Sequence, residues 1–152
     1  MIHPADIQPD VALKSLLVNQ IRVGNETSAT IVPVYADWER PTNGVPDDFI
    51  VIFINGDIQG VGMDTPFARG NIIVSLYDRL NDDGSVKKNR INKVLKQFDL
   101  LVEKQISGAY YYEYEARRFI TPPSPNQSTG YSVTNLNLRW NTTSKIINQQ
   151  NT

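Results

Sequence analysis

Apolar side chains recur at the spacing of one helical face in two segments of the chain. The first segment covers residues 10–23, where Pro9 suits the first helical turn and Gly24 suits a left-handed end. Its apolar positions are Leu13, Leu16, Leu17 and Ile21. The second segment, residues 86–106, has an almost uninterrupted apolar face. The two patterns predict two helices, of which the second is long and amphipathic.

Five other segments have the apolar, β-branched or aromatic character of strands. They are residues 30–35, 49–54, 71–77, 110–120 and 131–140. Residues 49–54 form a continuous apolar run, which is typical of a strand covered on both faces. Pro33 lacks the N–H that a ladder needs, so its strand is expected at a sheet edge. The dipeptide Asn55-Gly56 is a strong turn signal.

The last of these strands changes its alternation. Tyr131 and Val133 lie in one phase of the pleat. The residues in the other phase are Leu136, Leu138 and Trp140. Either the strand changes its buried face, or a bulge near Thr134 and Asn135 resets the pleat, and we favour the bulge.

The segments between these helices and strands are expected to be loops, and together the elements predict a fold class. Loops are expected at residues 36–48 and 121–129, and residues 57–70 are expected to form a short strand followed by a loop, with residues 59–70 as a docking loop. The loop at 121–129 holds Pro122, Pro123 and Pro125, which stiffen it into an extended arm that would lose little entropy on docking. The prediction is a single α+β domain, residues 1–141, with a mixed, mostly antiparallel sheet of about five strands against both helices. A polar tail, residues 142–152, follows.

Composition narrows the functional classes. A chain of 152 residues with 40% apolar and 20% charged residues suits one ordinary globular domain. The formal net charge is -1, so direct contact with nucleic acid is not expected. The absence of cysteine excludes disulfides, thiolate nucleophiles and cysteine-based zinc sites. The N-terminus is too polar for a signal peptide, and no apolar run approaches the ~20 residues that span a bilayer.

An acidic cluster follows the strand at residues 71–77. It consists of Asp78, Asp82 and Asp83. A calcium loop would place Gly84 sixth, but Arg79 and Arg90 would then occupy its first and twelfth positions, where oxygen ligands are needed. A magnesium site needs fewer ligands and stays open, although no other feature points to one.

The same cluster could also hold a carboxylate pair for acid–base chemistry, which would require burial or a like-charge neighbour. Asp82 and Asp83 stand beside a glycine, and we expect them in an exposed turn. Ser85 could then cap the long helix. We therefore interpret the cluster as the joint between a strand and a helix.

The polar face of the long helix is basic. Its cations are Lys87, Lys88, Arg90, Lys93 and Lys96. Cations in a first helical turn oppose the helix dipole. Either Asp82 and Asp83 offset them, or the face contacts an acidic partner such as a second copy of the chain.

Other candidates favour contact surfaces over chemistry. His3, the single histidine, lies in a polar terminal segment that is a poor place for the base of a catalytic triad. The glycine-rich segment at 57–70 lacks the ending of a phosphate loop, and its Phe67 and Arg69 would suit a surface that orders against a partner. Trp38, beside Arg40, is expected to anchor partly into the domain, with an interface hot spot as the alternative. Tyrosines at 110–114 are interpreted as sheet residues.

The order of elements resembles one known family. "DDFIVIFING" is followed by "NIIVSLYDR", which leads directly into "KKNRINKVLKQFDLLVEKQ", and "TGYSVTNLNLRW" closes the pattern. Over residues 10–141 this order is similar to the tail terminator, or tail completion, proteins of tailed bacteriophages and to related head-to-tail joining proteins. The resemblance implies a small fold of helices on a mixed or antiparallel sheet. It also implies a ring, usually of six copies, that caps the tail tube and meets the neck.

The expected function is therefore structural: a virion protein at the head–tail junction, made in the host cytoplasm, that catalyses no reaction and has no cofactor, metal or small-molecule substrate. Its expected partners are other copies, in a ring expected to be a hexamer, and neighbouring neck or connector and tail-tube proteins. The expected interface residues are Trp38, Arg40, Phe67, Arg69, Lys87, Lys88, Arg90, Lys93, Pro122, Pro123 and Pro125. Alternatives are a neck or collar ring of a short-tailed phage, a small nucleic-acid-binding or ligand-binding domain, and an enzyme that uses the aspartates of the strand–helix joint.

Overall fold

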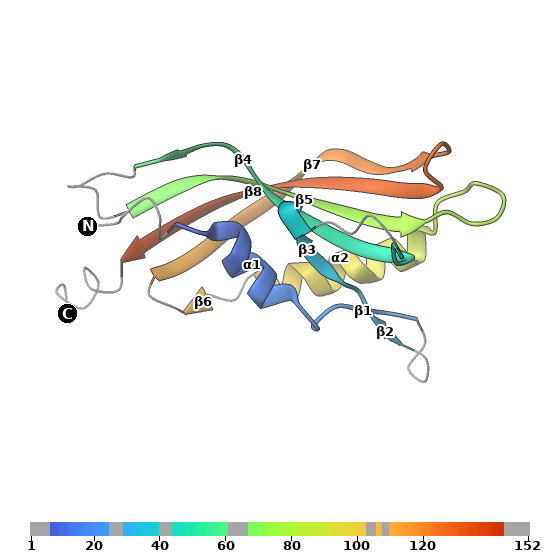
Figure 1. Ribbon diagram of the computed structural model, residues 1–152, viewed down its shortest axis with the longest axis horizontal. Helices are drawn as coiled ribbons and strands as arrows, with labels where there is room; N and C mark the ends of the chain where they lie inside the picture. Colours follow the sequence, from blue (N-terminus) through green and yellow to red (C-terminus); the bar gives the residue numbers. More distant parts are fainter. Residues whose placement is uncertain are drawn as a thin grey trace.

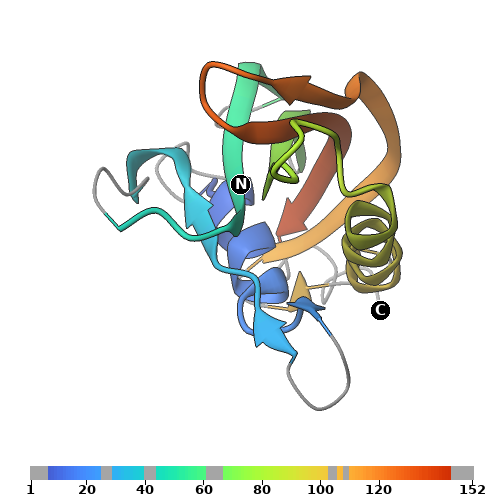
Figure 2. The ribbon, with the colours of Figure 1, turned by 90° about the vertical axis from the view of Figure 1, so that its right-hand side faces the viewer.

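A computed structural model describes residues 7–24, 29–39, 44–60, 67–102, 106–107 and 110–144. Six strands form one sheet in the order β3-β4-β5-β8-β7-β6, and β1 and β2 form a separate two-stranded ribbon. The elements are α1 (Pro9–Leu17), β1 (Arg22–Val23), β2 (Thr30–Ile31), β3 (Val34–Ala36), the 3-10 helix η2 (Asp37–Glu39), β4 (Asp48–Gln59), β5 (Phe67–Arg79), α2 (Lys88–Val102), β6 (Ile106–Ser107), β7 (Tyr110–Asn126) and β8 (Tyr131–Ser144). Both α-helices lie on the same face of the sheet (Figure 1), and the view from the end shows the sheet curling over them (Figure 2). The predicted α+β class is confirmed.

Helix α1 is shorter than its pattern predicts. It ends at Leu17, and the chain turns through Asn19, whose φ is 63°. Ile21 keeps the helical spacing and is fully buried, but it reaches the core from an extended segment. The apolar spacing in the sequence can thus continue past the end of a helix when a later, non-helical residue is also buried. The left-handed residue directly after the helix is Asn19, and not Gly24 as predicted.

Helix α2 begins at Lys88, later than predicted, and Ser85 does not cap it. The backbone N–H and the hydroxyl of Ser85 both donate to the Asp83 carboxylate, at 3.0 and 2.5 Å, and close a separate turn. The first helical bond runs from the Ile91 N–H to the Lys87 carbonyl. Helix α2 ends at residue 102, and Ile106, which was expected to end it, belongs to β6.

The predicted strand at 30–35 is divided into β2 and β3, with Pro33 between them. The Pro33 carbonyl accepts a hydrogen bond from the Ile50 N–H at 2.9 Å, directly before β3 pairs with β4 in parallel. Strand β3 lies at the edge of the six-stranded sheet. The edge position inferred from Pro33 is confirmed.

Asn55-Gly56 does not form a hairpin turn. Both residues lie inside β4, which continues to Gln59. The pairing with β5 passes from Asn55–Asn71 to Gln59–Arg69, so β4 contains extra residues and forms a bulge. Gly56 has a φ of 77°, which glycine adopts without strain. The dipeptide that signals a turn in the sequence therefore forms part of a bulge in the structure.

Strand β8 contains no bulge, and that prediction was wrong. It pairs with β5 in unbroken register from Tyr131 to Thr143. Alternate residues are buried along its whole length, namely Ser132, Thr134, Leu136, Leu138, Trp140 and Thr142. The buried phase begins with small polar side chains, which concealed it in the sequence. Tyr131 and Val133 lie on the opposite face of the sheet.

The predicted proline arm is instead the end of the β7–β8 hairpin. Residues 121–126 belong to β7 and pair with β8 through irregular register, and the turn follows at 127–130. Pro122 and Pro125 are exposed, and Pro123 is half-buried. Strand β8 also continues past Trp140, so its pairing includes residues 141–144, most of which were assigned to the polar tail.

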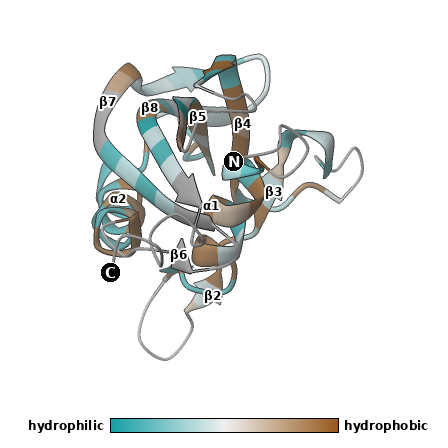
Figure 3. Cartoon of the chain, turned by 90° about the vertical axis from the view of Figure 1, so that its left-hand side faces the viewer, coloured by the Kyte–Doolittle hydropathy of each residue, from teal (hydrophilic) through white to brown (hydrophobic). Residues whose placement is uncertain are grey.

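The core lies between the sheet and the two helices, and the hydropathy colouring shows the apolar run of β4 that contributes to it (Figure 3). Trp140 is its largest fully buried side chain. Burial of a side chain such as Phe98 or Leu13 contributes about 1.5–3 kcal/mol. Gly70 lies against the Trp140 ring, because a Cβ at this position would stand 3.0 Å from it. The backbone of β5 therefore forms part of the tryptophan pocket.

We expect Gly70→Ala to lower the free energy of unfolding by about 1–3 kcal/mol, because the enclosed Trp140 ring cannot move away from the new methyl group. Chemical denaturation measures this loss. Asn71→Ala is the matched control, since its side chain lies on the other face and its effect should stay within about 0.5 kcal/mol. In a Trp140→Phe background the additional loss from Gly70→Ala should shrink; an equal loss in both backgrounds would contradict the contact.

Candidate functional site

Two buried carboxylates lie side by side where the sheet meets the beginning of α2. Asp48 is the first residue of β4, Asp78 is near the end of β5, and the two are directly paired across the strands. Asp48 is 7% exposed and Asp78 is 5% exposed. Neither carboxylate could remain charged at such burial without a compensating partner.

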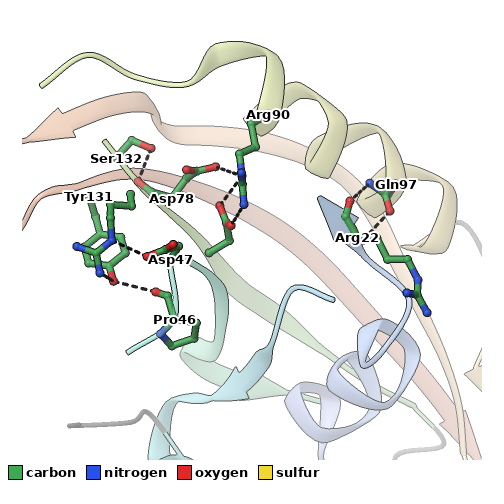
Figure 4. Close-up of polar contacts among 10 residues, drawn as sticks. Arg22, Pro46, Asp47, Asp78, Arg90, Gln97, Tyr131 and Ser132 are labelled. Carbon is green, nitrogen blue, oxygen red and sulfur yellow. Dashed lines mark hydrogen bonds and ion pairs between the residues drawn. The ribbon is translucent and has the colours of Figure 1, made fainter. Parts of the chain in front are cut away.

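That partner is Arg90, in the first turn of α2 (Figure 4). Its Nε donates to Asp48 Oδ1 at 3.1 Å, and its Nη2 bonds to the other Asp48 oxygen. The same Nε lies 3.6 Å from Asp78 Oδ2. One guanidinium therefore serves two carboxylates and ties the helix to two strands.

The two carboxyl groups differ in how well their hydrogen-bonding oxygens are paired. Asp78 Oδ1 is buried and has no hydrogen-bond partner among the described residues. Burial first, and then the hydrogen bond and the charge of neighbouring Asp48, raise the pKa of Asp78 to about 8, although Arg90 and Lys87 oppose the rise. The hydrogen bond to Asp48 in turn raises the pKa of Arg90. Asp78 is thus a candidate for a carboxyl group that stays protonated at neutral pH.

A second polar network lies beside the first. Arg79 donates to Asp47 at 2.6 Å and to the Tyr131 hydroxyl at 2.9 Å, and that hydroxyl donates to the Pro46 carbonyl at 2.8 Å (Figure 4). The hydrogen bond from Arg79 lowers the pKa of Asp47. The ring of Tyr131 also packs edge-on against Phe49. These contacts fix the chain that leads into β4, and therefore the position of Asp48.

The space beside the carboxylates is small. The cavity, lined by both of them together with Ile91 and Val94, has a volume of about 10 Å³, which is room for one water molecule. Within the described parts of the chain, no three metal-binding side chains come together. The arrangement can therefore hold a proton or a water molecule, and its evident role is to anchor α2.

Arg90 was expected on the basic contact face of the helix, but its side chain is only 32% exposed and is bonded to Asp48, and its role at an interface stays a prediction. Arg90 points into the joint, whereas Lys88, Lys93 and Lys96 are exposed and Lys87 is half-buried. Arg90, at the start of α2, is offset by Asp48 and Asp78 of the sheet. Asp82 and Asp83 lie in an exposed turn, as expected.

The sequence analysis missed Asp48 as a site residue. Asp48 directly precedes the apolar run of one predicted strand, and Asp78 directly follows that of another. In an antiparallel pair these two ends meet, which is the signal that could have brought them together. Without knowledge of which strands pair, the signal could not be used.

The remaining predicted interface residues lie apart from the carboxylates. Trp38, in η2, is 71% exposed, so it does not anchor into the domain, and its alternative role at an interface stays a prediction. Arg40 lies outside the described residues. Phe67 and Arg69 are both exposed on β5. Arg69 lines a polar depression together with Asp57, Gln59, Asn71 and Arg139.

No family model and no curated protein matches this chain. Neither helix of the described residues is long and apolar enough to cross a membrane.

We expect Arg90→Ala to lower the free energy of unfolding by roughly 3 kcal/mol, because it leaves the buried Asp48 carboxylate, beside the Asp78 carboxyl group, without a cation. Urea denaturation at pH 7 measures the change. Lys93→Ala, on the exposed side of the same helix, is the matched control and should change stability by less than about 0.5 kcal/mol. Equal, small effects of both substitutions would show that Arg90 does not hold the joint.

Proposed function

We propose that this protein is a structural subunit that joins copies of itself into a ring at the head–tail junction of a tailed phage or phage-like particle. The observation that carries the proposal is the pair of open edges of the sheet. The two edges differ from each other, and their strands run in opposite directions.

The first open edge is the outer side of β4. Strand β3 pairs only with residues 50–52 of β4. Among the described residues no strand pairs with this side of residues 53–59. An unpaired strand edge offers backbone N–H and C=O groups to another strand.

The second open edge is the outer side of β7. Strand β6 pairs only with Tyr111 and Tyr112. Beyond them β7 continues to Asn126 with no further partner on this side among the described strands. Phe119 and Ile120 are 45% and 49% exposed, so part of this edge is apolar. The prolines at 122, 123 and 125 cannot donate hydrogen bonds, which confines pairing to residues 113–121.

The strand directions suit pairing between copies. The steps β4–β5, β5–β8 and β8–β7 are all antiparallel, so β7 runs opposite to β4. A ring relates its subunits by rotation about one axis, so β7 of one copy would meet β4 of the next in antiparallel pairing. Because the two edges are different surfaces, the contact is of the head-to-tail kind, which forms a ring when the rotation between neighbouring copies closes.

The proposed ring is a hexamer that caps the tail tube, stops its growth and presents a platform to the neck or connector protein. Exposed Trp38 and Phe67 suit these contacts, since aromatic side chains are enriched at interface hot spots. Assembly of this kind makes and breaks no covalent bond. A neck or collar ring of a short-tailed phage would use the same edges.

We expect the wild-type protein to form a closed ring by native mass spectrometry and negative-stain imaging, alone or on purified tail tubes. Ile120→Lys should abolish the ring, because a charge would enter the paired edge, while circular dichroism shows an unchanged fold. Leu100→Lys is the control: Leu100 is also exposed, but it lies on α2. A wild-type protein that stays a single copy at high concentration and beside tail tubes would refute the proposal.

One observation favours the nucleic-acid alternative: Lys88, Lys93 and Lys96 are all exposed on one helix. A phosphate-binding face would give DNA or RNA affinity that falls steeply with salt. We expect no such binding in fluorescence anisotropy between low and physiological salt. Salt-dependent binding that Lys88→Glu and Lys93→Glu remove would instead support the alternative and count against a purely structural role.

A further inference from the structure

We propose that Asp48, Asp78 and Arg90 form a proton-operated latch that holds the first turn of α2 against the sheet. Two buried carboxylates face one guanidinium, and a single proton between them completes the neutral set. Release of that proton loosens the beginning of the helix. This inference does not depend on ring formation.

Arg90 interacts more closely with one of the two carboxylates than with the other. Asp48 receives two hydrogen bonds from the guanidinium, whereas the nearest Asp78 oxygen is 3.6 Å from it. Asp78 Oδ1 has no partner among the described residues. One cation cannot neutralise two adjacent anions in a site of low polarity, and a proton on the less satisfied carboxyl group removes the excess charge.

The other groups around Asp78 do not supply a second full counter-charge. From β8, the Ser132 hydroxyl donates to the Asp78 backbone carbonyl rather than to its carboxylate. Lys87, just before α2, lowers the pKa of Asp78, but less than Arg90 does. Arg79 is committed to Asp47 and Tyr131.

The remaining walls of the site are apolar or aromatic. From β4, β5 and α2 they consist of Phe49, Ile50, Leu76, Tyr77, Ile91 and Val94, with Val32 beside them. Burial is the largest cause that raises the pKa of Asp78 to about 8. The charged form is therefore the disfavoured form in the folded protein.

The sign of the pH dependence follows from this. Asp78 binds its proton more tightly when folded than when unfolded, so its contribution to stability is complete below its ordinary pKa of 3.8 and is lost as the pH rises toward about 8. One such proton changes the unfolding equilibrium by at most about tenfold per pH unit.

The loss of stability at higher pH should be concentrated at the start of α2. Arg90 stands in the first turn, whereas the middle of the helix has a separate tie: Gln97 accepts from the Arg22 N–H at 2.9 Å and donates to the Arg22 carbonyl at 2.7 Å (Figure 4). Phe98 is fully buried one residue later. The first turn can therefore loosen while the rest of the helix stays packed.

The sequence leaves few other groups that titrate in the useful range. The chain has one histidine and no cysteine. Between pH 7 and 9 the other groups with ordinary pKa values in or near the range are the histidine and the N-terminal amino group, and Asp78→Asn keeps both of them. A change in stability within this interval is therefore readily assigned.

The test compares wild type with Asp78→Asn, which keeps the shape of the side chain and removes its titration. Between pH 6 and 9 the melting temperature of wild type should fall, and that of Asp78→Asn should stay nearly level. Hydrogen exchange, expressed as protection relative to the intrinsic rate, should show the wild-type loss at residues 88–91 before the middle of α2. Asp82→Asn, in the exposed turn, should behave like wild type.

A melting temperature that is equally level in wild type and Asp78→Asn would overturn the latch. A direct measurement keeps the inference testable if Asp78→Asn does not fold. Carboxyl carbon NMR of the wild-type aspartates should show one titration well above the ordinary range, and its absence would also overturn the latch.

Discussion

The α-helices cover only one face of the sheet, so the strands must keep a continuous set of buried side chains on that face. Strand β8 meets this constraint along its full length, from Ser132 to Thr142, with small polar residues at its two ends and large apolar ones between them. Gly70 of β5, which has no side chain, leaves room on this face for the buried ring of Trp140. Departures from regular pairing are accordingly found in β4 beyond Asn55 and in β7, away from the regular β5–β8 pair.

Charged side chains replace apolar ones where the apolar face of the sheet ends. At the junction of β4, β5 and α2, the joint consists of two carboxylates and one guanidinium, and Asp78 is buried although one of its oxygens has no partner among the described residues. Buried ionic groups are a poor source of net stability, but breaking them is strongly destabilising, so they specify one arrangement over others. Here they connect the first turn of α2 to β4 and β5.

The outer strands have a different character from the inner ones. Strands β5 and β8 pair on both sides, whereas β4 and β7 each keep a long side with no partner among the described strands. Natural proteins commonly protect such edges with charge, bulges or proline, and this chain has bulges in both strands and prolines only at the end of β7. The stretch before those prolines, with exposed Phe119 and Ile120, is the part of the surface that we propose contacts a second copy of the chain.

The sequence by itself determined the α+β class, both helices, the edge position of the Pro33 segment and the exposed turn at Asp82 and Asp83, because these follow from local periodicity and backbone chemistry. It did not determine where pairing would override a local signal. Asn55-Gly56 became a bulge because β5 continued to pair with β4 beyond it, and the proline segment became strand because β8 was available beside it. The meeting of Asp48, Asp78 and Arg90 depended on contacts between residues far apart in the chain, and only the tertiary structure decided it, since no local pattern encodes which strand ends adjoin.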